Sequence, residues 1–228
     1  MRAAGTEERA AGEKRYLKSD LQFLGVAVPR IRTQARKWLR SQPDLSSEDL
    51  QRLVRALWRR RVHELRSFGI EILTLRLDLL TVEDLELVEW ILGRANTWAH
   101  VDPVAVQIAG PLVEQYPGLE SVLDQWAVDE NLWLRRSALL AHLLPLRQGA
   151  GEWGRFVRYA SQMIEEKEFF IRKAIGWVLR ETGKTTPQRV VGFLAANMGR
   201  VSGLTLREGV KHLSPEDRDP LLEAYRNR

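Results

Sequence analysis

The sequence predicts an all-α protein built from stacked pairs of helices, and two observations carry this prediction. Apolar residues recur at intervals of three and four along almost the whole chain, and no segment sustains the period-two alternation of a half-buried strand. Turn-forming residues such as Pro117 and Gly118 interrupt this pattern often, which predicts about a dozen helices of roughly 10–15 residues. We expect one domain over residues 1–228, with residues 1–10 disordered.

An internal repeat organises these helices. The segments ELRSFGIEIL, WLRRSALLAHL, FIRKAIGWVL and TLREGVKHL are alike, and their first basic residues lie 69, 37 and 35 residues apart. Halving the longest interval points to HVDPVAVQIAG, where Asp102 takes the register of the arginine. Repeats of this length are typical of a HEAT-like α-solenoid, although Leu-Arg pairs are also common near helix starts. We expect the equivalent residues to line one concave, basic face: Arg66, Asp102, Arg135 or Arg136, Lys173 and Arg207.

Charge is segregated along the chain. Residues 1–66 carry a net charge of +8, residues 67–134 a net −10 and residues 135–211 a net +8. Arginines outnumber lysines by 28 to 7, and the planar guanidinium binds phosphate well. The pattern favours nucleic acid as a partner, although genomic base composition and ordinary solvated faces also explain such charges.

Composition excludes several classes of site. The chain has no cysteine, and its four histidines are scattered, so disulfides, thiolate chemistry and a histidine metal site are not expected. No cofactor is expected either. No apolar run is long enough to span a membrane, and the charged N-terminus does not resemble a signal peptide, so we expect a soluble, intracellular protein. Of the eight tryptophans, helix packing accounts for six but not for Trp98 and Trp177.

The most informative helix is expected from about Glu168 to Thr182. Lys173, Trp177, Arg180 and Lys184 follow one another at intervals of four, three and four, so they share a face opposite the apolar stripe. A tryptophan among three cations fits a surface that meets a polyanion. The alternative is a partly buried tryptophan shielded by basic side chains.

Two further residues stand out. A helix expected from about Asn131 to Leu144 carries Arg136 inside its apolar stripe, so its guanidinium must be paired or face a cleft; an internal salt bridge is the alternative. Trp98 and Asp102 are expected in a loop, where Pro103 begins the next helix and Asp102 serves as its N-cap. Capping alone explains this carboxylate structurally, but it also fits a group that stabilises a cation beside an aromatic ring.

These segments resemble a known family. KEFFIRKAIGWVLRE (167–181), DENLWLRRSALL, TWAHVD and KRYLKSDLQFLGVAVP are similar to segments of the bacterial DNA alkylation repair glycosylases of the AlkD-like, HEAT-repeat type. The resemblance covers most of residues 12–215. It implies a monofunctional glycosylase that cuts the N-glycosidic bond of N3- or N7-alkylated purines in duplex DNA, leaves an abasic site and does not flip the base. We expect it to act as a monomer in the bacterial cytoplasm, at the nucleoid when bound to DNA.

The resemblance also implies roles for single residues. The catalytic aspartate falls on Asp102, flanking tryptophans on Trp98 and Trp177, and the active-site arginine on Arg136. The DNA-binding set that we infer consists of Tyr16, Arg66, Arg135, Lys173, Arg180, Lys184, Arg207 and Lys211. One alternative is a non-catalytic HEAT-like protein that binds damaged or branched DNA, and another is a protein-binding scaffold.

Overall fold

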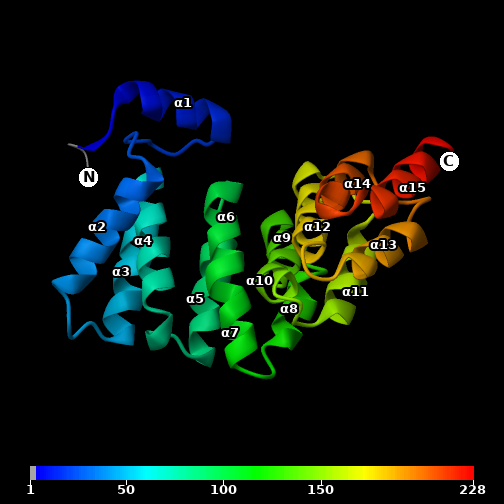
Figure 1. Ribbon diagram of the computed structural model, residues 1–228. Helices are drawn as coiled ribbons and strands as arrows, with labels where there is room; N and C mark the ends of the chain where they lie inside the picture. The colour runs from blue at the N-terminus through cyan, green and yellow to red at the C-terminus, as the bar shows by residue number, and fades with distance from the viewer. Residues whose placement is uncertain (1–3) are drawn as a thin grey trace. The chain divides into compact units, whose positions relative to one another are not determined.

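The structure is a computed structural model that describes residues 4–228 (Figure 1). Its regular elements are all helical within that range, apart from one isolated bridge between Gln22 and Val62, so the all-α prediction is confirmed. The chain divides into two compact units, which meet in sequence between Tyr116 and Pro117. Each unit is described by itself below.

Unit 1 begins with α1 (Glu7–Leu17), α2 (Val28–Arg40), α3 (Ser47–Arg59) and α4 (His63–Leu75), and continues through the 3₁₀ turns η2 (Leu77–Leu79) and η3 (Val82–Asp84), α5 (Leu85–Leu92), α6 (Trp98–Val104), the π-helical η4 (Ala105–Ala109) and α7 (Gly110–Gln115). Unit 2 comprises α8 (Glu120–Trp126), α9 (Leu132–Leu140), α10 (Leu143–Arg147), α11 (Trp153–Met163), α12 (Phe169–Thr182), α13 (Pro187–Ala196), α14 (Gly203–Gly209), the 3₁₀ turn η5 (Val210–His212) and α15 (Pro215–Arg226). Of the N-terminal residues expected to be disordered, residues 1–3 lie outside the described part, and α1 begins at Glu7.

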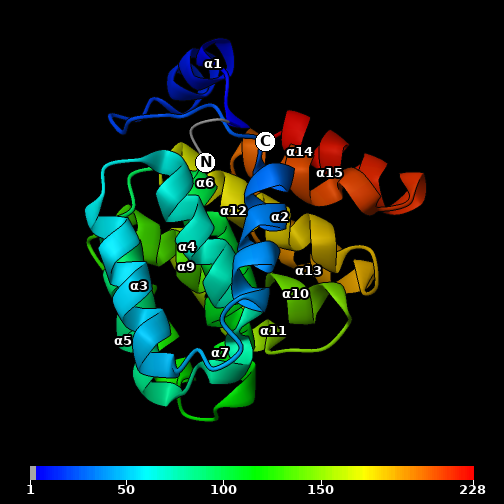
Figure 2. The same ribbon diagram turned by 90° about the vertical axis from the view of Figure 1, so that its left-hand side faces the viewer.

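Helices α2, α3 and α4 lie side by side in unit 1 (Figures 1 and 2). The sequence of α3 shows why. Ser46 caps its N-terminus by accepting a hydrogen bond from the Asp49 amide, and the buried Leu50, Val54 and Trp58 recur every four residues on one face. Burial of such a stripe is worth about 2 kcal/mol per large side chain and fixes α3 against α4.

Helix α12 is central to unit 2, where it packs against α9, α10 and α14. It spans Phe169–Thr182, within one residue of the sequence prediction, and its predicted apolar stripe is fully buried. Gly176 allows α14 to approach closely, because a Cβ there would lie 2.6 Å from the Cβ of Glu208. The absence of a side chain at Gly176 therefore helps to place Glu208 beside α12.

The prediction of a single helix from Asn131 to Leu144 is wrong. The structure instead ends α9 at Leu140 and begins α10 at Leu143. Pro145 explains the break, because a proline lacks the N–H that would bond to the carbonyl of Ala141 and its ring would clash there. The sequence contained this signal, but the continuous run of leucines obscured it.

The repeat register that the sequence predicts is visible in the helices themselves. Asp102, Arg136, Lys173 and Arg207 are each the fifth residue of their helix, in α6, α9, α12 and α14. Arg66 is the fourth residue of α4. The register therefore selects Arg136 rather than Arg135 as the member from α9. The repeated helical pairs are confirmed, whereas the concave basic face remains a prediction.

Candidate functional site

Helix α6 places Trp98 and Asp102 on one face. Thr97 caps the helix, its buried hydroxyl accepting a hydrogen bond from the Ala99 amide at 3.3 Å. Trp98 is the first helical residue, and Asp102 follows four residues later, so the two side chains are neighbours on the helix surface. Both are half-buried.

The predicted loop around these residues is therefore wrong, as is the assignment of Asp102 as an N-cap. Pro103 lies inside α6 instead of beginning a helix. A proline at this point removes one helical N–H donor, and the chain continues directly into the wider turn of η4. Since the threonine cap lies five residues earlier, the structure keeps Asp102 on a rigid helix rather than at a loop tip.

Tyr16 joins Trp98 from a different helix. Its ring lies 5.9 Å from the Trp98 ring, centroid to centroid, in an edge-to-face arrangement at 87°. Tyr16 is 72% exposed, so this contact leaves most of its ring open to solvent. Unit 1 thus brings together three predicted site residues, which we call the aromatic–carboxylate cluster: Tyr16, Trp98 and Asp102.

A buried carboxylate holds the segment that carries Tyr16. Glu64 on α4 has no exposed surface, and its oxygens accept hydrogen bonds from the amides of Leu24 at 2.9 Å, Gly25 at 2.7 Å and Val26 at 3.2 Å. These amides belong to the linker between α1 and α2, residues 18–27. Gly25 adopts a left-handed backbone (φ 71°), and a Cβ there would lie 2.0 Å from the carbonyl oxygen of Thr6. Glu64 therefore fixes the linker, and through it α1.

The same linker also contacts the segment that leads into α6. Asp20 accepts a hydrogen bond from the Asn96 side chain at 2.7 Å, two residues before Trp98. It also pairs with Arg61, which lies between α3 and α4. Asp20 thus ties the linker to the residues preceding α6, while the aromatic contact joins the two helices.

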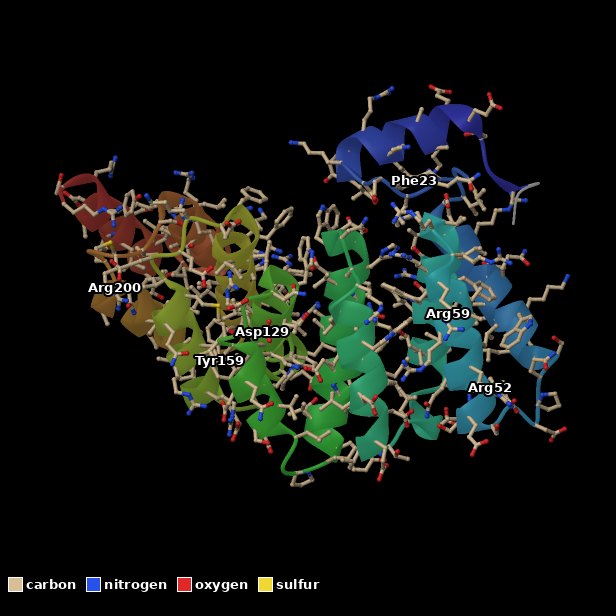
Figure 3. The ribbon with its side chains drawn as sticks, turned by 180° about the vertical axis from the view of Figure 1, so that it is seen from behind. Phe23, Arg52, Arg59, Asp129, Tyr159 and Arg200 are labelled. Carbon is tan, nitrogen blue, oxygen red and sulfur yellow. The ribbon has the colours of Figure 1, made fainter. Side chains whose placement is uncertain are left out.

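His100 anchors α6 to the interior of unit 1. Its fully buried ring stacks on His63 at 4.5 Å and meets Trp58 edge-on at 5.4 Å. Its Nε2 lies 3.2 Å from both the His63 carbonyl oxygen and the Ser67 hydroxyl of α4. Phe23, beneath α1 in Figure 3, extends the stack by covering His63 at 4.6 Å. Trp98 and Asp102 therefore flank a residue that is locked in the core.

Acid should destabilise the fold through its buried histidines. Burial lowers the pKa of His63, lowers that of His100 well below its ordinary value, and lowers that of His142 in unit 2 to about 4. Below about pH 6.5 the histidines of the unfolded chain bind protons, whereas the buried histidines of the folded chain stay neutral. The free energy of unfolding is therefore highest above about pH 6.5 and falls as the pH is lowered below that value. At about pH 5.5, keeping His142 neutral in the folded chain costs about 1.4 kcal/mol relative to the unfolded chain, since its pKa is about 4.

Urea denaturation at about pH 7.5 and about pH 5.5 measures this effect. His142→Phe removes one of the three contributions, so we expect its free energy of unfolding to depend less on pH. An equal free energy of unfolding for the wild-type protein at the two pH values would contradict the assignment.

Unit 2 holds the other two predicted catalytic residues. Arg136 is only 3% exposed, and its Nη1 donates a hydrogen bond to the carbonyl of Phe170 at the start of α12. Its guanidinium also lies 5.8 Å from the centre of the Phe170 ring. Trp177, two turns further along α12, is half-buried. Of the two surroundings expected for the Arg136 guanidinium, a partner or a cleft, the hydrogen bond to Phe170 shows a partner, and its role in a site stays a prediction.

The predicted basic face of α12 is built around two buried glutamates. Glu208 binds Lys173, Arg180 and Lys211, each at 2.7 Å. Glu181 binds Lys184 at 2.6 Å and also contacts Arg147 and Arg180 at 3.4 Å. Five cationic side chains thus surround two carboxylates, so the group carries a net charge of +3. Burial opposes ionisation of Glu208, but the hydrogen bonds from its lysines prevail and lower its pKa to about 2.

The other predicted DNA contacts differ in their surroundings. Arg66 is buried against the Trp58 ring, 5.0 Å from its centroid, and donates a hydrogen bond to the Arg60 carbonyl. Arg135 binds Glu166 at 3.1 Å and the backbone carbonyls of Asp129 and Glu130, just before α9. Arg207 is exposed.

The sequence predictions above do not include the three glutamates at positions 64, 181 and 208. Glu181 and Glu208 each lie three residues before a lysine that they bind, at helical spacing, so this signal was readable. The role of Glu64 could not be predicted in this way, because its hydrogen-bond partners lie about 40 residues away in the sequence.

No group of three or more potential ligand side chains that could hold a metal ion occurs in residues 4–228. In the same range, no helix combines the length and apolar character needed to cross a bilayer.

Comparisons with known proteins agree with this architecture. A family described as DNA alkylation repair enzyme matches residues 1–213. A predicted DNA alkylation repair enzyme from Enterococcus faecalis has a similar structure, with a TM-score of 0.83 and 25% identity, over 92% of this chain and 97% of that chain. A search of curated proteins finds no significant match.

Two structures from Streptococcus mutans share the fold. AlkD2 has a TM-score of 0.57 and 14% identity, over 96% of both chains. The protein smu.31 has a TM-score of 0.56 and 15% identity, over 87% of this chain and 95% of that chain. The resemblance inferred from the sequence is confirmed: with a family match over nearly its whole length, the chain belongs to the DNA alkylation repair enzymes.

Proposed function

We propose that the protein is a monofunctional DNA glycosylase of base-excision repair. It hydrolyses the N-glycosidic bond of N3- or N7-alkylated purines in duplex DNA, releases the base without flipping it and leaves an abasic site. The observation that carries the proposal is the aromatic–carboxylate cluster, in which Asp102 and Trp98 share a face of α6 and Tyr16 meets Trp98 at 5.9 Å. Membership of a DNA alkylation repair family supports it.

The chemistry needs little beyond this cluster. An N3- or N7-alkylpurine is already cationic, so it leaves without a general acid, and the enzyme must stabilise the positive charge that develops on the sugar. A carboxylate about 4 Å from that charge contributes about 4 kcal/mol at an effective dielectric of 20. Asp102 supplies this charge and positions the attacking water, while the ring of Trp98 favours the cationic sugar edge.

The remaining roles follow the family resemblance. Trp177 provides a second aromatic surface, and Arg136 is the active-site arginine. The DNA-binding set includes Tyr16 with the cations of α4, α9, α12, α14 and η5. The cations around Glu208 and Glu181 retain three positive charges, which suits phosphate contact. The protein acts as a monomer without a cofactor.

A base-release assay tests the proposal. The protein is incubated with methylated duplex DNA, and the released bases are separated by chromatography; a uracil-containing duplex serves as the neutral-base control. We expect release of 7-methylguanine and 3-methyladenine but not of uracil. The alkylpurines are cationic in the nucleotide and leave as neutral bases, whereas uracil is neutral in the nucleotide and would have to leave as an anion, which makes it a poorer leaving group.

Release of no methylated base would overturn the proposal and favour the alternative, a non-catalytic protein that binds damaged or branched DNA. Equal release of uracil would contradict the leaving-group argument.

A further inference from the structure

Helix α2 is a cationic helix that the proposed site does not use. Its 13 residues include five cations and no carboxylate, and all five cations are exposed: Arg30, Arg32, Arg36, Lys37 and Arg40. Its fully buried residues are Ile31 and Ala35, which face the rest of unit 1. Figure 2 shows α2 with α3 at the near side of that unit.

The cations of α2 differ from those of unit 2 in their partners. Of the five, only Arg32 has an ion pair within residues 4–228, with Glu71 of α4 at 2.9 Å. In contrast, Lys173, Arg180, Lys184 and Lys211 are all bound to buried glutamates. The other four cations of α2 have no ion pair in the described part of the chain, so they raise the local positive potential and are available to an external anion.

The arginines are also arranged for binding. Arg32, Arg36 and Arg40 recur every four residues, which places them about 6 Å apart along one side of α2. Beside this row lies a groove of about 380 Å³ between α2 and the end of α4, lined by Arg36, Arg40 and Arg76 with Leu39 and Leu75. The only carboxylates paired with these arginines in the described chain are Glu71, on Arg32, and Asp78, on Arg76.

We propose that this α2 face, formed by Arg30, Arg32, Arg36, Lys37, Arg40 and Arg76, is a second contact surface for the phosphate backbone of duplex DNA, separate from the aromatic–carboxylate cluster. The inference rests on the proposed function only in taking DNA as the partner. Guanidinium groups bind phosphate in a bidentate manner, and an evenly spaced row matches a polymer of repeating anions better than a single small ligand. Such contacts carry no base specificity, so the surface holds the protein on undamaged DNA.

The salt dependence of DNA binding tests this inference. The affinity of an unmodified duplex is measured by fluorescence anisotropy over a series of salt concentrations, for the wild-type protein and for the double variant Arg36→Gln/Arg40→Gln. Each phosphate contact contributes about 0.9 to the slope of log affinity against log salt. Losing two contacts should therefore make the slope shallower by about two.

A matched control removes the same charge elsewhere. Arg189→Gln/Arg226→Gln changes two exposed arginines on α13 and α15, and we expect the slope to stay at the wild-type value. An unchanged slope in the α2 variant, or an equal change in both variants, would overturn the inference, as would a wild-type protein that does not bind DNA. The assay uses undamaged DNA, so its outcome is independent of base release: a protein that binds through α2 but releases no base refutes the proposed glycosylase alone.

Discussion

Asp102→Asn is expected to slow the release of 7-methylguanine about a thousandfold. The substitution keeps the size and polarity of the side chain at its position on α6 but removes the negative charge. A charge stabilisation of about 4 kcal/mol at an effective dielectric of 20 corresponds to about three orders of magnitude in rate. Single-turnover base release with the protein in excess measures this rate without interference from product dissociation.

The reason for expecting a rate effect and not a binding effect is that the charge on the sugar develops only in the transition state. DNA affinity should therefore be equal to that of the wild-type protein or slightly higher, because one negative charge has been removed. Asp219→Asn, an exposed position on α15, is the control for the change in net charge. Base release at the wild-type rate by the Asp102 variant would exclude Asp102 as the catalytic carboxylate.

Glu64→Gln is expected to lower both stability and base release, although Glu64 touches no proposed substrate. The buried carboxylate accepts hydrogen bonds from the amides of Leu24, Gly25 and Val26, and an amide side chain satisfies them only in part. Loss of charge-assisted hydrogen bonds in a buried site costs about 3 kcal/mol. The linker then loosens, and the Tyr16 ring loses its position against Trp98.

A double-mutant cycle separates this positioning effect from general destabilisation. If Glu64 acts through Tyr16, then Glu64→Gln should reduce the rate of base release in the wild-type background but add little to Tyr16→Ala. Rates are compared at a temperature where circular dichroism shows every variant to be folded. Glu13→Gln, which disrupts the partly exposed ion pair with Arg9 on α1, is the control and should change stability by less than about 1 kcal/mol. Additive effects in the cycle would show that Glu64 only stabilises the fold.

Local sequence patterns predicted much of the fold. The apolar stripe of α12 gave its bounds to within one residue, and the repeat spacing anticipated the shared position of Asp102, Arg136 and Lys173 in their helices. Both signals depend on residues within a few turns of each other, where helical geometry alone sets the pattern.

Errors arose where two local signals competed. Pro103 was interpreted as a helix start, although Thr97 provided an equally good cap five residues before Asp102. Conversely, the run of leucines predicts one continuous helix, whereas Pro145 marks the break between α9 and α10. A proline is compatible with both a helix start and a helix interruption, so its position alone does not decide between them.

Long-range pairing was beyond the sequence. The hydrogen bonds from the linker to Glu64 and the ion pairs from Lys173 and Arg180 to Glu208 join residues 28 to 40 positions apart. Nothing in a single helix predicts them, because they depend on how helices pack. The net charge of +8 over residues 135–211 therefore overstates the positive charge that remains on α12 once its cations are paired with Glu181 and Glu208.

Helix α1 has one more consequence. None of its residues is buried, so the hydrophobic core of unit 1 does not depend on what this helix contains, yet it delivers Tyr16 to the cluster. Substitutions along this helix can therefore change the surroundings of the Trp98 ring without disturbing the packed interior of unit 1.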